Sequence, residues 1–300
     1  MTTLGSVLQS AEGLAEARQV QMVAARFSGG LLLGMNEQIN CTACVSGFGS
    51  VGSMAAGAHG RYPLSERLTV LGGFSVGQSA EHGVVVKSSP VFALALRYDF
   101  VDWGPSRPFG EIGGYVAPLD QLRFTRVYAN GAGLARGIGD TSGQSAAAFV
   151  RFGWLFRVSP INEFAVSGEV GRAAQRVRGY SEPLTQTNPF EATVRTGTDL
   201  MNYVKIGAQF THLFGERIEV NVNGGVVRSF GTKDGLKLSV DGFGVLAPPP
   251  LKDLTWLEYG GRIGVRFSPH SILDVFLDAT TGQKPLGSLI HGGVGLRYAF

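Results

Sequence analysis

The chain has 300 residues, of which 44% are apolar and 16% are charged, with a formal net charge of +3. The apolar share excludes a disordered chain, and the small net charge argues against a nucleic-acid partner. Forty-four glycines are close to twice the usual share and do not fit an ordinary soluble helical protein. No long unbroken apolar run exists, so no transmembrane helix is expected. A mean hydropathy of +0.12 without such a run is typical of alternating transmembrane strands.

The first predicted element is a helix over residues 6–26. The residues of one face, all apolar except one arginine, recur in this segment at spacings of three and four: Val7, Leu8, Ala11, Leu14, Ala15, Arg18 and Met22. We therefore divide the chain into an N-terminal helix or linker, residues 1–26, and a barrel, residues 27–300. The first five residues lack the basic and apolar regions of a signal peptide, so that signal is absent from this chain and is expected upstream.

Two cysteines follow the helix, Cys41 and Cys44, in the order Cys-Thr-Ala-Cys. A structural zinc site needs four ligands, and no second pair exists. A redox-active pair of the thioredoxin type needs a βαβ context, which the neighbouring sequence lacks. The pair is interpreted as a small loop disulfide or as two inert thiols beside the first long loop. No cofactor and no metal site is implied.

From Phe27 onward, apolar residues recur with the period of two that is typical of strands. The last strand shows it most clearly, since one face carries Ile290, Val294, Leu296, Tyr298 and Phe300. Similar strands recur upstream and give about twelve in all, the first two near 28–36 and 44–60. This predicts an all-β fold, a closed antiparallel transmembrane barrel, with the N-terminal helix in its lumen. Closure follows because an open sheet edge in lipid would leave backbone groups without hydrogen bonds.

Two kinds of connection alternate along the chain. Short turns rich in proline and glycine are predicted at 61–66, 102–108, 159–163, 214–217 and 268–271. Longer polar excursions lie near 129–146, 179–193, 231–252 and 280–288. Short turns at one end and long loops at the other are typical of outer-membrane barrels of Gram-negative bacteria.

The polar face of the strands is expected to line the lumen, because it holds glycine, alanine, serine and single charges of both signs. Aromatic residues on the opposite face lie beside the short turns, as in the interfacial girdle of a membrane barrel. The charges expected to face the lumen are Arg97, Glu111, Arg151, Glu169, Arg262, Arg266, Asp274, Asp278 and Arg297. Two interpretations stay open: these charges brace the barrel only, or some of them hold the helix or tune conductance.

Four glycine-rich segments together resemble the C-terminal translocator domain of autotransporters (type V secretion): residues 55–75, 107–115, 258–267 and 293–300. The resemblance implies a twelve-stranded barrel whose pore is threaded by a helix that connects an exported passenger to the first strand. The aromatic residues of the last strand, Tyr298 and Phe300, resemble the signal that the barrel-assembly machinery reads. The implied location is the cell outer membrane.

The expected function is therefore that of a translocator or anchor barrel for an N-terminal passenger. The implied partners are outer-membrane lipid, the barrel-assembly machinery and a covalently linked passenger, if one exists upstream. One alternative is a porin-like or structural barrel without a passenger. Another is an outer-membrane barrel enzyme, but the five histidines are scattered and none has a serine or carboxylate partner by spacing, so catalytic residues are not expected.

Overall fold

The computed structural model describes residues 4–34, 43–51, 54–81, 83–130, 133–246, 248 and 250–300. One helix lies within these ranges, α1 (Leu4–Gly34). The long strands are β1 (Cys44–Val51), β2 (Met54–Pro63), β3 (Leu68–Glu81), β4 (Val84–Asp99), β5 (Ser106–Ala129), β6 (Leu134–Ser159), β7 (Asn162–Val177), β10 (Gly197–Phe214), β11 (Ile218–Lys233), β14 (Thr255–Arg266), β15 (Ser271–Gly282) and β16 (Ser288–Ala299). Four short strands are β8 (Tyr180–Glu182), β9 (Ala192–Val194), β12 (Leu238–Val240) and β13 (Gly244–Leu246).

The long strands form a closed barrel in which each strand is antiparallel to both of its neighbours. Closure occurs between the first and last strands: β1 pairs with β2 on one side and with β16 on the other. Among the described residues the barrel has twelve strands, which confirms the predicted fold class. Because no strand of the barrel is left with a free edge, the sheet satisfies its own backbone hydrogen bonds, as a lipid environment requires.

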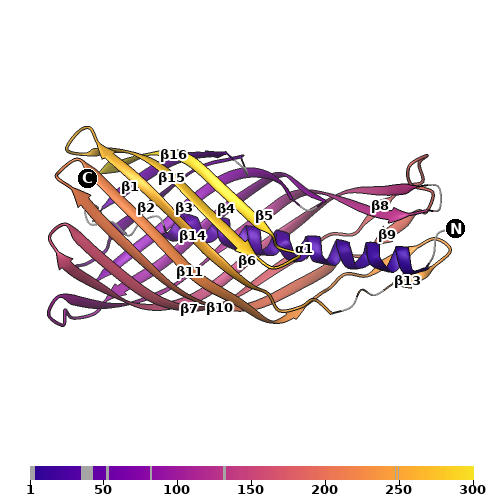
Figure 1. Cartoon of the computed structure of the whole chain (residues 1–300), viewed down its shortest axis with the longest axis horizontal. Helices are drawn as coiled ribbons and strands as arrows, with labels where there is room; N and C mark the ends of the chain where they lie inside the picture. Colours follow the sequence, from indigo (N-terminus) through magenta and orange to yellow (C-terminus); the bar gives the residue numbers. More distant parts are fainter. Residues whose placement is uncertain are drawn as a thin grey trace.

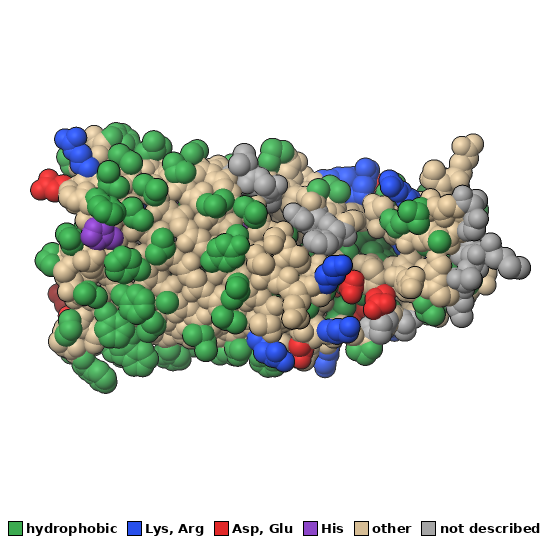
Figure 2. All heavy atoms as spheres, in the orientation of Figure 1, with side chains coloured by type: hydrophobic (Ala, Val, Ile, Leu, Met, Phe, Trp, Pro, Cys, Tyr) green, Lys and Arg blue, Asp and Glu red, His purple; other side chains and the backbone are tan. Residues whose placement is uncertain are grey.

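The apolar face of each strand points outward, as the sequence predicts. Val294 and Leu296 of β16 are 57% and 52% exposed, whereas the inward Arg97 and Arg297 are 4% and 1% exposed. In Figure 2 the charged side chains on the visible face gather toward one end, with a few at the opposite rim, and leave an uncharged zone between them. This arrangement is that of a membrane barrel and not of a soluble β-protein with a dry interior.

The two ends of the barrel differ. At one end, which we call the short-turn end, brief turns such as residues 64–67 and 215–217 connect the strands. At the other, the long-loop end, β5 and β6 extend as a hairpin of 24 and 26 residues. The expected polar excursion near 129–146 is therefore largely strand. The excursions near 179–193 and 231–252 supply a separate four-stranded sheet, in the order β13-β12-β9-β8, which we call the cap sheet. It lies at the end of the barrel where the chain begins (Figure 1).

The N-terminal region differs from the prediction in one respect. The helix continues past residue 26 to Gly34, so the strand expected near 28–36 is wrong, and residues 44–60 belong to two strands, β1 and β2. Leu32 and Leu33 are neighbours in the chain and both are buried. A strand in a barrel wall buries only alternate residues, whereas a helix enclosed on several sides buries consecutive ones. None of the helices described is both long and apolar enough to cross a membrane.

The outward face of β16 provides a first test of the membrane barrel. Val294→Arg should lower the free energy of unfolding in lipid vesicles by about 2–4 kcal/mol, because it places a charge near the middle of the hydrocarbon layer. Thr198→Arg, at an exposed position near the long-loop end of β10, should cost only about 0–1 kcal/mol. Urea titration of refolded protein measures both. Equal costs for the two variants would contradict the assigned membrane position.

Candidate functional site: the helix-filled lumen

The helix runs through the lumen along the barrel axis (Figure 1). At the long-loop end, the Ser6 hydroxyl accepts a hydrogen bond from the Ala129 amide at 2.8 Å. Farther along, Gly29 lies against the ring of Tyr115. Between these contacts the helix advances 23 residues and β5 returns 14. At about 1.5 Å per helical residue and about 3.4 Å per strand residue with a tilt near 40°, both paths cover about 35 Å. The helix is therefore nearly parallel to the axis.

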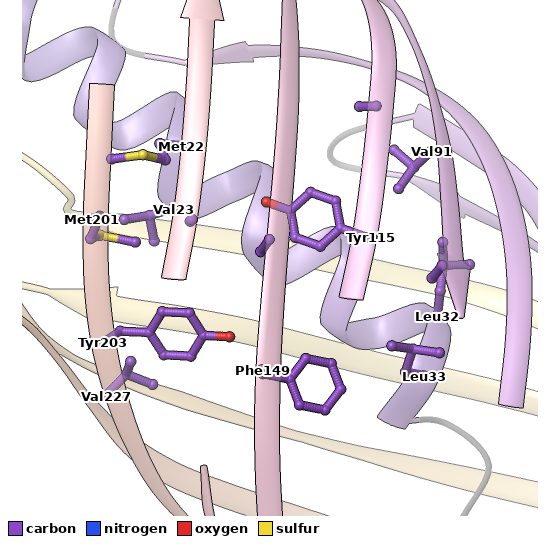
Figure 3. Close-up of a cluster of buried hydrophobic side chains, with 14 of the residues drawn as sticks. Met22, Val23, Leu32, Leu33, Val91, Tyr115, Phe149, Met201, Tyr203 and Val227 are labelled. Carbon is purple, nitrogen blue, oxygen red and sulfur yellow. The ribbon is translucent and has the colours of Figure 1, made fainter. Parts of the chain in front are cut away.

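Wall residues enclose the middle of the helix on all sides. All seven residues of segment 17–23 are buried, although only some would be buried if the helix lay on a surface. Figure 3 shows Met22 and Val23 of the helix near Met201 and Tyr203 of β10. The N-terminal half packs into a second apolar cluster that includes Leu238 and other buried apolar residues of the cap sheet. The cap sheet thus covers the helix where it leaves the barrel wall.

One glycine allows the helix to lie close against the wall. A Cβ atom added to Gly29 would lie 2.2 Å from a ring carbon of Tyr115. That separation is far below a carbon–carbon contact distance, so any larger residue would move the ring or the helix. Gly29 therefore has a steric role, since it lets the helix lie against the wall at this point.

Two arginines of the helix are paired with acids of the wall. Arg18 donates two hydrogen bonds to Asp199 of β10, at 2.9 and 3.0 Å, and both side chains are fully buried. Arg26 donates to Glu258 of β14 and, at 3.4 Å, to Glu169 of β7. Such charge-assisted bonds gain strength where water is excluded. They fix the helix both in position along the axis and in rotation about it.

The acids that bind Arg26 also have cations of their own in the wall. Lys205 donates to Glu258 at 2.8 Å. Arg151 donates to Glu169 at 2.8 Å and to Glu111 at 3.2 Å. A chain of alternating charges thus crosses β5, β6, β7, β10 and β14 and meets the helix at Arg26. Glu169 and Glu258 are each compensated by two cations, one from the helix and one from the wall.

A second group of charges lies on another part of the lumen face, across β11, β14, β15 and β16. Arg297 donates to Asp274 at 2.7 Å and to Glu219 at 3.2 Å. Arg262 reaches the same two acids, at 3.5 and 3.3 Å. These pairs are buried and join neighbouring strands across the lumen face. Their geometry is that of a brace between strands.

The remaining predicted charges take separate positions. Arg97 donates to Asp99 at 3.0 Å and lies over the Phe109 ring. Asp278 is buried and lines a cavity of about 140 Å³ between the helix and the wall, together with Lys205 and Arg262. Arg266, at the short-turn end, is only half-buried and its guanidinium reaches the Pro269 carbonyl at 3.5 Å in the adjacent turn. It is therefore a residue of the rim.

Several residues of the lumen were not expected from the sequence. Arg18 was assigned to an apolar helix face, and Arg26 and Asp199 were not singled out. The sequence does hold a signal for these residues: a charge in an apolar or glycine-rich segment needs a partner once it is buried. The partner itself depends on a separation of 181 residues between Arg18 and Asp199, which spacing along the chain does not predict.

The structure describes only one residue of the cysteine pair. Cys41 lies outside the described residues, so the bond to Cys44 stays a prediction. The sequence predicts the cysteine pair beside the first long loop. This is wrong for Cys44, which begins β1 opposite Ala299 and therefore lies at the short-turn end. Tyr298 and Phe300 are exposed on the outer face, with ring centroids 5.4 Å apart. No group of three or more His, Cys, Asp or Glu side chains in the described ranges could hold a metal ion.

Comparison with solved structures supports the same architecture. The translocator domain of the autotransporter NalP from Neisseria meningitidis is similar over 99% of this chain and 100% of that chain, with 14% identity and a TM-score of 0.57. The β domain of the Bordetella autotransporter BrkA matches 86% of this chain and 98% of its own, with 13% identity and a TM-score of 0.46. The outer membrane protease OmpT from Escherichia coli matches 88% and 99%, with 10% identity and a TM-score of 0.38.

The first of these similarities shows a shared fold, a twelve-stranded barrel with a helix packed against its strands. The two weaker ones are too low to support a function. Neither the protein-family models nor the curated proteins contain a match to this sequence. The chain is thus a barrel of the autotransporter translocator type in its fold, and the role of its lumen is argued below from its own residues.

The pairing of Arg26 leads to a prediction about stability. Arg26→Met removes the cation but keeps an apolar side chain, and the free energy of unfolding should fall by about 2 kcal/mol, less than for a fully orphaned pair because Lys205 and Arg151 remain. Adding Glu258→Gln to this variant should cost less than the sum of the two single changes. Glu16→Met is the control, since Glu16 lies on the same helix at a half-buried site and forms no ion pair with the residues that the structure describes. Strict additivity in the double variant would contradict the assigned contact.

The loop beside Arg18 leads to a prediction about pH. Burial raises the pKa of Asp234 to about 6, and the nearby Asp199 carboxylate adds to the shift. The pKa of Asp234 in the folded state lies above its value in the unfolded state, near 3.9. The contribution of Asp234 to the free energy of unfolding therefore falls as pH rises from about 4 to about 6 and is then constant. Asp234→Asn should stabilise the barrel by on the order of 1 kcal/mol at pH 8 and have no effect at pH 4. Urea midpoints at both pH values measure this, and equal gains at both would refute it.

Proposed function

We propose that this protein is the translocator and membrane anchor of an autotransporter. The observation that carries the proposal is the path of the chain. Its helix begins at the long-loop end beside Ala129, runs through the lumen, and is followed in the sequence by β1, which begins at the short-turn end. A segment joined to the start of the helix would therefore emerge at the long-loop end. By analogy with outer-membrane barrels, that end faces the outside of the cell.

The role of the lumen in this proposal is mechanical. Its inner face carries small residues and paired charges, which suits the passage of a polar, extended segment, and no covalent step is required. The ion pairs of Arg18 and Arg26 then hold the helix as a plug and anchor. The other lumen charges brace the wall. No cofactor takes part, and the barrel has no enzymatic role.

The proposed partners follow from the outer surface and the chain end. The apolar outer face contacts outer-membrane lipid. Tyr298 and Phe300, exposed on the last strand, are the residues for the barrel-assembly machinery to recognise. A passenger is joined covalently to the start of the helix. A porin-like barrel without a passenger is the alternative that the experiments below distinguish.

Surface display tests the path of the chain. We expect an epitope fused before residue 1, behind an export signal, to be labelled on intact cells and removed by added protease. The same epitope placed in the 102–105 turn should be labelled only after the outer membrane is opened. An epitope before residue 1 that stays protected in intact cells, with the barrel folded, would overturn the proposal.

Single-channel conductance tests the plug. The full chain should conduct little, because the helix occupies the lumen, and deletion of residues 1–34 should increase the conductance severalfold. A twelve-stranded barrel without its helix leaves an aqueous passage. A porin-like barrel would conduct equally with and without this segment.

A further inference from the structure

The arginines of the barrel divide into two groups by the face on which they lie. Five that point into the lumen are paired with acids: Arg97, Arg126, Arg151, Arg262 and Arg297. Arg172 and Arg176 of β7, with Arg178 directly after it, are exposed. In the part of the chain that the structure describes, none of these three has an ion-pair partner. We call them the β7 arginine row.

The β7 arginine row lies at the upper edge of the apolar outer surface. Arg172 is two residues beyond the exposed Val170, and both point outward. Toward the long-loop end, Arg176 and Arg178 continue the row at four and two residues, which are steps of about 13 and 7 Å along the strand. The row therefore starts where the hydrocarbon contact ends and extends through the depth of a lipid head-group layer.

The neighbours of the row on both adjacent strands are uncharged. Arg176 is opposite Gln144 of β6 and Thr198 of β10. Arg172 is opposite Ala148 and Asn202. Three of these positions offer a polar hydrogen-bonding side chain, the fourth is an alanine, and none of the four is a carboxylate. The row is thus a concentration of positive charge whose counter-charge must come from outside the protein.

A nearby basic cluster shows the contrast. Asp140 of β6 accepts two hydrogen bonds from Arg123, both at 3.0 Å, and one from Lys87 at 2.6 Å. The hydrogen bond from Arg123 is the main reason that the pKa of Asp140 is lowered, to about 2. This carboxylate stays charged at any physiological pH and offsets its two cations in part. The β7 arginine row has no such residue.

We propose that the β7 arginine row binds the phosphate groups of a phosphorylated lipid in the leaflet at the long-loop end. Guanidinium groups bind phosphate oxygens through paired hydrogen bonds, which makes arginine the residue suited to this contact. The acyl chains of the same lipid would lie against the apolar surface below, including Val170. The proposal needs only the membrane barrel and does not depend on passenger transport.

Lipid binding to the purified full chain tests the proposal. The probe is lipid A that carries both phosphates, added to the protein in detergent micelles, with bound lipid counted by native mass spectrometry. The triple variant Arg172→Gln, Arg176→Gln, Arg178→Gln should bind about tenfold more weakly, as expected for the loss of charge-assisted hydrogen bonds. Arg123→Gln, in the self-compensated cluster, should stay within about twofold of the unchanged chain. The heat-dependent gel shift of folded barrels confirms that each variant is folded.

Two further measurements separate the sources of binding. Dephosphorylated lipid A should bind the unchanged chain as weakly as intact lipid A binds the triple variant. Inorganic phosphate at millimolar concentration should not displace bound lipid A, because acyl contacts add to the affinity. Unchanged binding by the triple variant, or equal binding of the dephosphorylated lipid, would overturn the proposal. Displacement by inorganic phosphate would overturn the assignment to a lipid. Surface display of a passenger plays no part in these tests.

Discussion

The structure depends on one constraint: where a closed sheet crosses the hydrocarbon layer, the charges of its strands must lie on the inner face, and each of these buried charges has to find a partner. The lumen meets this constraint with pairs that cross strands, such as Arg297 with Asp274, and with pairs that involve the helix. Arg26 is held between Glu258 and Glu169. The helix is therefore part of the charge balance of the barrel as well as a filling of its lumen.

The two ion pairs of the helix are not equivalent. If the helix left the lumen, Glu258 would keep Lys205 and Glu169 would keep Arg151. Among the described residues, Asp199 would keep the hydrogen bond from the Gly235 amide, at 2.9 Å, and the contact with the Asp234 carboxyl, neither of which supplies a cation. Leaving a buried carboxylate without its cation is the costlier change. The middle of the lumen is thus compatible with an empty or differently occupied pore, whereas the contact near the cap sheet favours the helix in place.

The parts of the fold that depend on a period of two, the long strands and their two faces, could be predicted from the sequence. The outward row of Val294, Leu296 and Tyr298 is found in the structure, and most of the charges that were predicted to face the lumen are buried there. The residues 28–34, Ser-Gly-Gly-Leu-Leu-Leu-Gly, were predicted as strand because the period of two was taken to begin at Phe27, although glycine weakens the alternation there. Enclosure in the lumen decides their conformation. The strands of the cap sheet are three residues long, too short for any period to be recognised.

The candidate site could be predicted only by class. The alternation of strand faces identifies Glu169 as an acid of the lumen. Its partners Arg151 and Arg26, however, come from a neighbouring strand and from the helix, which is distant in the sequence. Strand β7 shows why the faces of one strand must be considered separately. Its inner face supplies Glu169 to the charge balance of the lumen, and its outer face carries Arg172 and Arg176 without acids. The first set of charges is satisfied when the chain folds. The second is left for the surroundings of the barrel, since an arginine beside a head-group layer can be neutralised there without a partner in the protein.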